Sequence, residues 1–266
     1  MLIDCHTHLD HCREDPAALV NEAWEAGVGL IIQAGIDLER SLHSVRLAER
    51  FPEVFATVGF HPQEAGLLTD QLMLDIAELA AHPRVIAVGE TGLDFYHDNW
   101  PHDVQKRVFI RHIELARQTG LPVVIHTRDA ADDTLEILAD HATGLTVILH
   151  CFSLSHMLEE IIDRSYYVSF AGNVTYAKAL DLQAAAANVP DHLLLLETDA
   201  PWLAPVPLRG RHNRPALVAH TYEFVAGLRQ VSAEQLAAQV ELNARRAFPR
   251  LAERLAERSG RPRRRQ

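Results

Sequence analysis

Eight short apolar runs, separated by helical segments, constrain the fold of this 266-residue chain more than any other feature. The runs are rich in Val, Ile and Leu, as parallel strands covered on both faces are, and parallel strands need crossover helices between them. Eight strand–helix units in about this length predict an α/β fold, the (β/α)8 TIM barrel of metal-dependent hydrolases. The runs lie at 2–8, 29–36, 54–62, 85–94, 121–129, 145–153, 166–174 and 193–201.

The segments between the runs carry apolar residues at helical spacing, with Gly or Pro near their ends. The clearest of these predicted helices lie at 16–27, 39–51, 70–82, 103–120 and 132–142. No linker or low-complexity block divides the chain, so we predict one barrel domain over 1–257. The last residues, RSGRPRRRQ, predict a basic, disordered tail over 258–266.

Composition excludes several classes of protein. A net charge of −11 argues against a protein that coats duplex DNA with a broad basic face, but not against a nuclease, because bound divalent ions invert the local field. No apolar run is long enough to cross a bilayer and no secretory signal begins the chain, so we expect a cytoplasmic protein without a membrane partner. Cys5, Cys12 and Cys151 show no CxxC spacing, which indicates reduced thiols that pack as small apolar residues.

A barrel assembles its active site at the carboxyl ends of its strands, and the polar residues that packing does not explain fall there. They end the first, third, fourth, fifth, sixth and eighth runs. These residues are His6, His8, His61, Glu90, Asp94, His126, Arg128, His150, Glu197 and Asp199.

The histidines in this set point to a metal centre. His6 and His8 are two residues apart, so they share one strand face, although one H-x-H is weak evidence in a chain with 16 histidines. His126 and His150 each follow a purely apolar run, where a buried imidazole needs a partner; satisfied core histidines are the alternative. With Glu90 and Asp199 as oxygen ligands, the set predicts a two-metal hydrolytic site bridged by a carboxylate.

A series of motifs along nearly the whole chain resembles the TatD family of metal-dependent deoxyribonucleases, within the amidohydrolase superfamily. The matching blocks are IDCHTHLD, GFHP, GETGLDFY, LPVVIHTRDA, LHCFSLS, VSFAGNVTY, LLLETDAPWLAP and NARRAF. The resemblance implies a divalent-metal-dependent hydrolase of DNA phosphodiesters, EC class 3.1, acting in DNA repair or catabolism.

The resemblance also assigns roles to the residues. It implies two divalent ions, Mg²⁺, Mn²⁺ or Zn²⁺, held by His6, His8, Glu90 and Asp199 at one site and by Glu90, His126 and His150 at the other. Asp199 and Glu90 are then the catalytic carboxylates, with Asp199 as the base that orients or deprotonates the attacking water. His61 would face the substrate phosphate, unless it only caps its loop.

Further residues are expected around the ligands. Arg128 is predicted to bind phosphate or, with equal weight, to pair with Asp94 or Glu197. Trp202 is a candidate to stack on an unpaired base, with rim packing as its alternative. Glu197 and Asp94 are expected to orient the ligands from behind. The remaining histidines are expected on the surface, among them His43, His82, His112 and His192.

Two features separate this chain from related patterns. Where the TatD family usually reads Arg-Asn-Glu-Pro, this chain has Arg214 in place of the acid, which either loses a loop salt bridge or adds a phosphate contact. Many amidohydrolases bridge their metals with a carboxylated lysine on the fourth strand, but Lys106 and Lys178 are the only lysines and neither ends that strand. Glu90 stands there instead.

The expected activity is 3′-to-5′ trimming of single-stranded or damaged DNA by a monomer. Two rival functions stay open at this point. One is hydrolysis of a small amide, cyclic amide or ester, because the same metal centre attacks carbonyl groups. The other is a non-catalytic, metal-bound scaffold.

Overall fold

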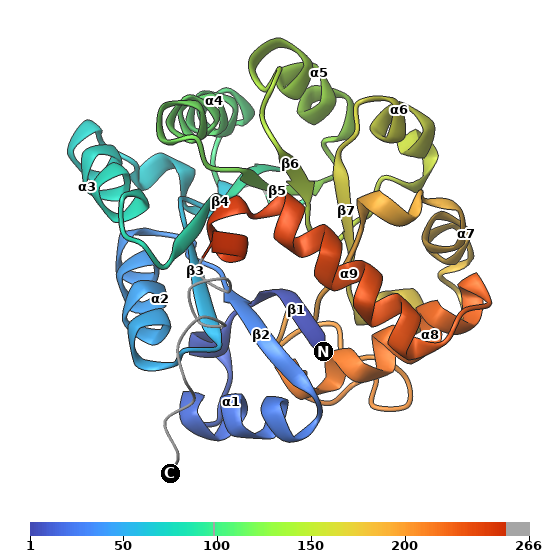
Figure 1. Ribbon diagram of the computed structural model, residues 1–266. Helices are drawn as coiled ribbons and strands as arrows, with labels where there is room; N and C mark the ends of the chain where they lie inside the picture. Colours follow the sequence, from blue (N-terminus) through green and yellow to red (C-terminus); the bar gives the residue numbers. More distant parts are fainter. Residues whose placement is uncertain (98, 254–266) are drawn as a thin grey trace.

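A computed structural model describes residues 1–97 and 99–253. The predicted basic tail, 258–266, and the last four residues of the predicted domain lie outside the described residues. Eight parallel strands follow one another around one sheet in chain order, which confirms the predicted barrel (Figure 1). They are β1 (Leu2–Thr7), β2 (Val28–Gln33), β3 (Val54–Val58), β4 (Val85–Asp94), β5 (Val123–Arg128), β6 (Val147–Leu149), β7 (Tyr167–Phe170) and β8 (Leu194–Leu196).

Helices α1 to α8 form a ring around the strands, and the five predicted helices are among them, whereas α9 lies across one end of the barrel (Figure 1). They are α1 (Pro16–Glu25), α2 (Leu38–Arg50), α3 (Asp70–Ala80), α4 (His102–Thr119), α5 (Ala131–His141), α6 (Leu158–Asp163), α7 (Leu180–Asn188), α8 (Val218–Arg229) and α9 (Ala233–Ala247). Short 3₁₀ helices occupy the loops: Leu9–His11, Pro62–Leu67, Ser155–Met157, Gly172–Thr175, Asp191–Leu193 and Pro215–Leu217.

Local sequence explains where these helices begin. The side chain of Asp15 accepts a hydrogen bond from the backbone N–H of Ala17, and Pro16 occupies the first helical position of α1. Ser232 and Gln235 form a reciprocal capping box at the start of α9. No helix in the described part of the chain is long and apolar enough to cross a membrane.

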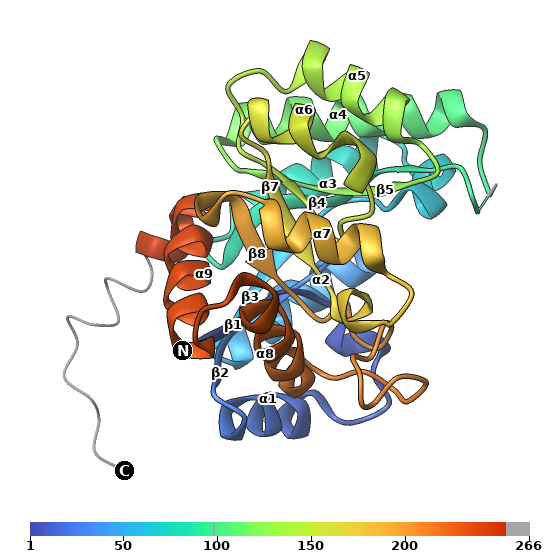
Figure 2. The same ribbon diagram turned by 90° about the vertical axis from the view of Figure 1, so that its right-hand side faces the viewer.

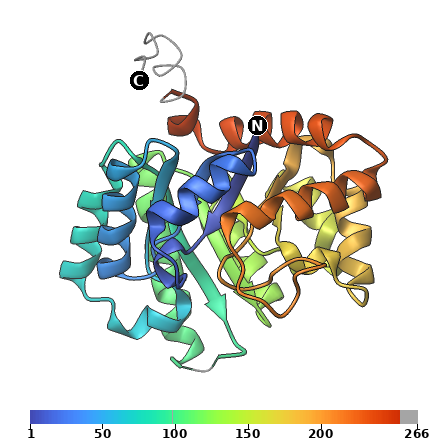
Figure 3. The same ribbon diagram turned by 90° about the horizontal axis from the view of Figure 1, so that it is seen from below.

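One end of the barrel is closed by α9. This helix lies across the strand starts in Figure 1, and in Figure 3 the strands point away from it. Phe248 and Leu251, which follow α9, are fully buried in the core. The guanidinium of Arg250 donates to the carbonyls of Ala80 and Val85, at 2.7 and 3.0 Å, which fixes the segment against the start of β4.

The other end of the barrel carries the longer loops. Figure 2 shows α9 on one side of the strands and the loop after β8 on the opposite side. Two backbone hydrogen bonds join this loop to β1: the N–H of Asp199 donates to the carbonyl of His6 at 3.0 Å, and the N–H of His8 donates to Ala200 at 2.8 Å. The first and last strands therefore meet where the predicted ligands lie.

Candidate metal centre

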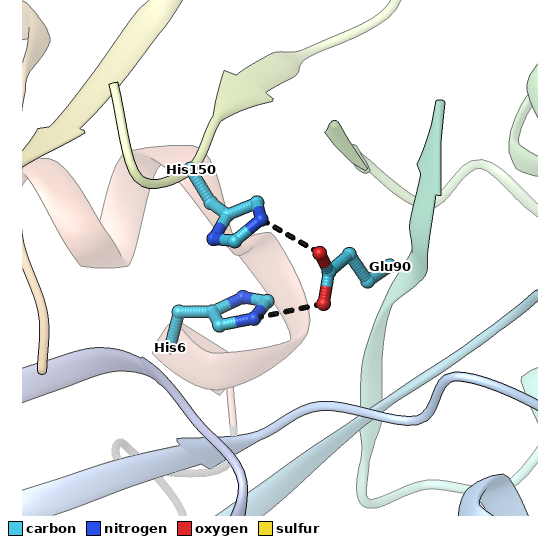
Figure 4. Close-up of side chains that lie close together, drawn as sticks. All are labelled: His6, Glu90 and His150. Carbon is cyan, nitrogen blue, oxygen red and sulfur yellow. Dashed lines mark hydrogen bonds and ion pairs between the residues drawn. The ribbon is translucent and has the colours of Figure 1, made fainter. Parts of the chain in front are cut away.

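Glu90 lies at the centre of the predicted ligand set. On one side of its carboxylate, Oε1 lies 2.8 Å from Nδ1 of His126 and 2.8 Å from Nε2 of His150. On the other side, Oε2 lies 3.2 Å from Nε2 of His6 and 3.4 Å from Nε2 of His8. Figure 4 shows His150 and His6 reaching different oxygens of the same carboxylate. Each oxygen of Glu90 thus faces its own pair of imidazoles.

Two glycines let β4 carry Glu90 into this position. Gly89 and Gly92 have φ angles of 137° and 140°, a region that residues with a Cβ rarely adopt. A Cβ at Gly92 would lie 2.0 Å from the carbonyl oxygen of His126, and one at Gly89 would lie 2.5 Å from that of Val124. The irregular register between β4 and β5 at Val88 therefore depends on glycine.

Asp199 lies beside the β1 pair. Its Oδ1 is 3.6 Å from Nε2 of His8, and its backbone is in the left-handed region with φ 52°. Asp199 follows β8 by three residues, and its side chain is 13% exposed, so water and substrate can reach it. The structure therefore brings all six predicted ligands into one cluster.

His61 is as close to Glu90 as the predicted ligand His8 is. Its Nδ1 accepts a hydrogen bond from the backbone N–H of Gln63 and caps the Pro62–Leu67 turn, while its Nε2 lies 3.4 Å from Glu90 Oε1. The His61 and His126 rings meet edge to face at 4.4 Å between centroids. His61 therefore caps its loop with one ring nitrogen and faces the cluster with the other. In this position it can serve as a metal ligand as well as a substrate contact.

Asp94 and Glu197 lie behind the ligand histidines. Asp94 Oδ2 is 3.5 Å from Nε2 of His126 and accepts from the Gln63 side chain at 3.1 Å. Glu197 Oε1 is 3.3 Å from Nδ1 of His150 and accepts the backbone N–H of Cys151 at 2.7 Å. Both carboxylates are fully buried, so each can fix the orientation of the imidazole it contacts.

Asp4 is a buried carboxyl group near the site that the sequence reasoning missed. Its two oxygens accept the backbone N–H and the hydroxyl of Thr198, at 2.8 and 2.6 Å. Burial raises the pKa of Asp4 well above its ordinary value. Because Thr198 precedes Asp199, this contact fixes the junction between β1 and β8. The sequence contains a signal for this contact, because an acid that directly follows the apolar residues Leu2 and Ile3 in a buried strand needs a hydrogen-bond partner.

The charges of the cluster are strongly coupled. Burial opposes a charge on His8, but hydrogen bonds to Asp199 and Glu90 outweigh it and raise the pKa of His8 to about 10. Burial and the neighbouring His126 lower the pKa of His61 to about 4. The surrounding imidazoles, His150 foremost, overcome burial and hold the pKa of Glu90 well below its ordinary value. Cations entering this cluster must displace protons, so their affinity falls with falling pH.

The donor set fits divalent cations. His6 Nε2 lies 3.2 Å from His8 Nε2, and His126 Nδ1 lies 3.4 Å from His150 Nε2. Lone pairs that face each other at these distances repel unless a proton or a cation lies between them. Ligand atoms come within 4.8 Å of one another in three overlapping groups around Glu90 and Asp199: His6, Glu90 and His150; His6, His8 and Asp199; and His61, Glu90 and His126.

A further group of His8, Asp10 and His11 also has its ligand atoms within 4.8 Å of one another. Asp10, however, already accepts hydrogen bonds from Gln33 at 2.8 Å and from Arg40 at 3.1 Å. These contacts occupy its oxygens, so we assign Asp10 to the support of the loop rather than to the metal centre.

Arg128 lies at the open mouth of the barrel. It is exposed, and its guanidinium stacks on the Tyr96 ring at 3.9 Å. Within the described ranges, no ion pair joins Arg128 to Asp94 or Glu197, so the predicted pairing with either acid is not observed. Its N–H groups stay available to a phosphate.

Trp202 lies on the rim. Its side chain is 49% exposed and meets the His8 ring at 5.3 Å and the His11 ring at 5.6 Å between centroids. Arg214, which replaces the usual acid of the loop, has its guanidinium 3.2 Å from the carboxylate of Glu22 in α1. The loop is therefore joined to α1 by a salt bridge in which the loop supplies the cation.

The surface assignment of His112 was wrong. His112 in α4 is fully buried: its Nε2 accepts the backbone N–H of Phe60 at 3.0 Å, and its Nδ1 donates to the carbonyl of Val108. The helical spacing around it did not reveal this contact, because its partner lies in the loop before His61. Cys5 is buried as expected, whereas Cys12 and Cys151 are partly buried, and all three are free thiols.

Known proteins that are similar to this chain include metal-dependent hydrolases, in agreement with a metal-binding site. The model of the family described as TatD related DNase matches residues 3–249. The chain is 40% identical over 260 residues to "Uncharacterized metal-dependent hydrolase TatD" of Mycobacterium tuberculosis, which covers 93% of this chain and 97% of that protein. It is 36% identical to "3'-5' ssDNA/RNA exonuclease TatD" of Musicola paradisiaca over 242 residues, or 88% and 92% of the two chains.

A solved structure shares the architecture. The crystal structure of YJJV, a TatD homologue from Escherichia coli K12, superposes with a TM-score of 0.88 at 29% identity, and the match covers 93% of this chain and 98% of that one.

Proposed function

The chain belongs to the TatD related DNase family of metal-dependent hydrolases, and from that premise we propose that it hydrolyses phosphodiester bonds of unpaired DNA, trimming strands from the 3′ end with two divalent ions. The relative from Musicola paradisiaca is named for this kind of activity on single-stranded DNA and RNA.

The split contacts of Glu90 carry the proposal. One carboxylate oxygen faces His126 and His150, and the other faces His6 and His8. A carboxylate with one oxygen for each cation is the usual bridge of a two-metal hydrolytic site. Such sites can clamp both the attacking and the leaving oxygen of a phosphoryl group. The name of the relative from Musicola paradisiaca supports a phosphodiester rather than a carbonyl substrate.

Two divalent ions held in this cluster would supply the positive charge that acidifies water and neutralises the phosphate. Asp199 is the residue that we expect to accept the proton of the attacking water, because its carboxylate lies at the exposed edge of the cluster. Nε2 of His8 lies 3.6 Å from one of its oxygens. His8 and His150 overcome the effect of burial and lower the pKa of Asp199, so the carboxylate is ionised and can orient the attacking water.

The residues behind the cluster restrict motion of the ligands. Glu197 fixes His150 and Asp94 fixes His126 through the nitrogen that does not face Glu90. Arg128, stacked on Tyr96, then contributes planar N–H donors to the phosphate as charge accumulates on its oxygens.

The test uses single strands of DNA labelled at the 5′ or the 3′ end, incubated with Mg²⁺, Mn²⁺ or Zn²⁺. We expect a 5′-labelled strand to give a descending ladder and a 3′-labelled strand to release its label at once. The Asp199→Asn variant should lose at least about 10²-fold in rate, the low end for a general base. Internal nicks in duplex DNA alone, or release of acid from small amides without phosphodiester cleavage, would contradict the proposal.

A further inference from the structure

A cavity opens beside the metal centre, in the loops after β7 and β8. It has a volume of about 560 Å³ and is lined by Tyr176, Trp202, Arg209, Arg211 and His212, among others. We call it the basic pocket. Ligand pockets for small molecules have volumes of roughly 300–1,000 Å³, so the volume suits one nucleotide.

The basic pocket is positively charged in an otherwise acidic protein. The net charge of the chain is −11, yet residues 200–222 contain no Asp or Glu and three arginines. Arg214 pairs with Glu22, whereas Arg209 and Arg211 form no ion pair with a carboxylate in the part of the chain that the structure describes. Two cations without a protein counter-charge therefore line the pocket, and they favour an anionic ligand.

Arg209 is held in a defined position. Its guanidinium lies 4.3 Å from the centroid of the Tyr176 ring, and the Tyr176 hydroxyl donates to the carbonyl of Ala204 at 3.1 Å. Stacking fixes the plane of the guanidinium without using its N–H groups. The edge of Arg209 is thus free to bind two oxygens of a phosphate.

Trp202 connects the pocket with the metal centre, because it lines the pocket on one side and contacts the His8 ring on the other. The side chain of Asn213 donates to the carbonyls of Thr198 and Trp202, at 2.8 and 2.6 Å. The loop is therefore attached to the segment that carries Asp199, and pocket and centre are adjacent parts of one surface.

We propose that the basic pocket binds the nucleotide adjacent to the scissile phosphate of an unpaired strand, with Arg209 on the next phosphate and Trp202 against the base. The inference rests on the proposed function and extends it: the substrate is a chain with at least two phosphates, not a single diester. Only an unpaired base presents its face to an exposed indole, which is why the strand must be single.

The experiment measures binding and cleavage of fluorescein-labelled thymidine oligonucleotides. Binding of the octamer is followed by anisotropy in EDTA from 50 to 200 mM salt, and cleavage is followed with Mn²⁺. Arg209→Gln should weaken octamer binding by about tenfold, as expected for a charge-assisted contact. The slope of log affinity against log salt should fall by about 0.7, the value for one phosphate on a single strand.

Cleavage distinguishes substrates by their number of phosphates. Arg209→Gln should raise KM for the octamer and affect the dinucleoside monophosphate, which has one phosphate, by less than twofold. Arg209→Lys keeps the charge but loses the planar guanidinium that stacks on Tyr176. Its KM for the octamer should lie between those of the wild type and of Arg209→Gln. Arg46→Gln, an exposed arginine in α2, is the matched control, with binding and cleavage like the wild type.

Four outcomes decide the inference. An octamer affinity for Arg209→Gln within twofold of the wild type, with an unchanged salt slope, would overturn it, as would equal losses on octamer and dinucleoside. Displacement of the octamer by inorganic phosphate at matched ionic strength would make the pocket a site for free phosphate, which also overturns it. A wild type that cleaves no oligonucleotide with any metal would instead remove the proposed function and the inference together.

Discussion

The two ends of the barrel use opposite kinds of side chain. At the strand starts, residues such as Ile3, Val54 and Val85 are fully buried, and Phe248 and Leu251 pack beneath α9. At the strand ends, imidazoles and carboxylates gather around Glu90, where His6, His8 and His150 are buried and His126 and Asp199 are partly exposed. An apolar end stabilises the fold, whereas a buried polar end is costly unless cations compensate its charges.

This contrast separates stability from chemistry. The apolar end needs only shape complementarity, so a change there should affect unfolding and leave the metal content alone. The polar end keeps ionisable groups buried at a cost in desolvation. A substitution there should therefore lower the metal content and the rate of hydrolysis before it lowers the free energy of unfolding.

The largest effect is expected for Glu90→Gln. The amide keeps the size of the side chain but removes the charge that both sets of imidazoles face, so at least one ion should be lost. The rate should fall at least about 10³-fold, since bridged cations supply several kcal/mol of transition-state stabilisation. Metal analysis and a diesterase assay check this, with exposed Glu78→Gln as control. Two bound ions and a wild-type rate in Glu90→Gln would show that the polar end of the barrel does not depend on this carboxylate for its metal chemistry.

At the apolar end, Phe248→Ala should lower the free energy of unfolding by about 3–5 kcal/mol, the range for truncating a buried phenylalanine. Metal content per folded molecule and kcat should stay within twofold of the wild type. Urea unfolding and metal analysis on the same preparation measure both quantities. A loss of metal at unchanged stability would show that the two ends are not separable.

The smallest effect concerns His112, which is buried and neutral between α4 and the loop that carries His61. Burial lowers its pKa to about 4, against about 6.5 in the unfolded chain. Between these values the unfolded state binds a proton that the folded state does not, so stability falls as pH falls from about 6.5 to 4.

The contribution of His112 is about 3 kcal/mol over that window. In His112→Gln, which cannot titrate, the decrease in unfolding free energy from pH 7 to pH 4 should be smaller by about this amount. Urea unfolding at several pH values in EDTA gives the comparison without any metal contribution. The same pH dependence in both proteins would show that His112 is protonated in the fold or lies open to water.

Much of the fold and of the candidate ligand set was predictable from the sequence, because short local patterns determine both. The eight apolar runs became eight parallel strands, and the spacing of His6, in β1, and His8, directly after it, brought their Nε2 atoms to 3.2 Å from each other. Glu90, His126 and His150 were recognisable because each polar residue ends a run that packing alone would keep apolar. Periodicity and the cost of burying a polar group are local properties, so one sequence is enough to read them.

Other features depend on contacts between distant segments. His112 has an unremarkable helical position, and only the loop before His61 makes it a buried hydrogen-bond partner. Asp4 finds Thr198 across 194 residues, and Arg209 finds Tyr176 only when the loops after β7 and β8 meet. The chain alone set which polar residues end the apolar runs. Closure of the barrel decided which of them meet and buried others, such as His112, because a hydrogen bond or stacked pair depends on distance in space and not on separation in sequence.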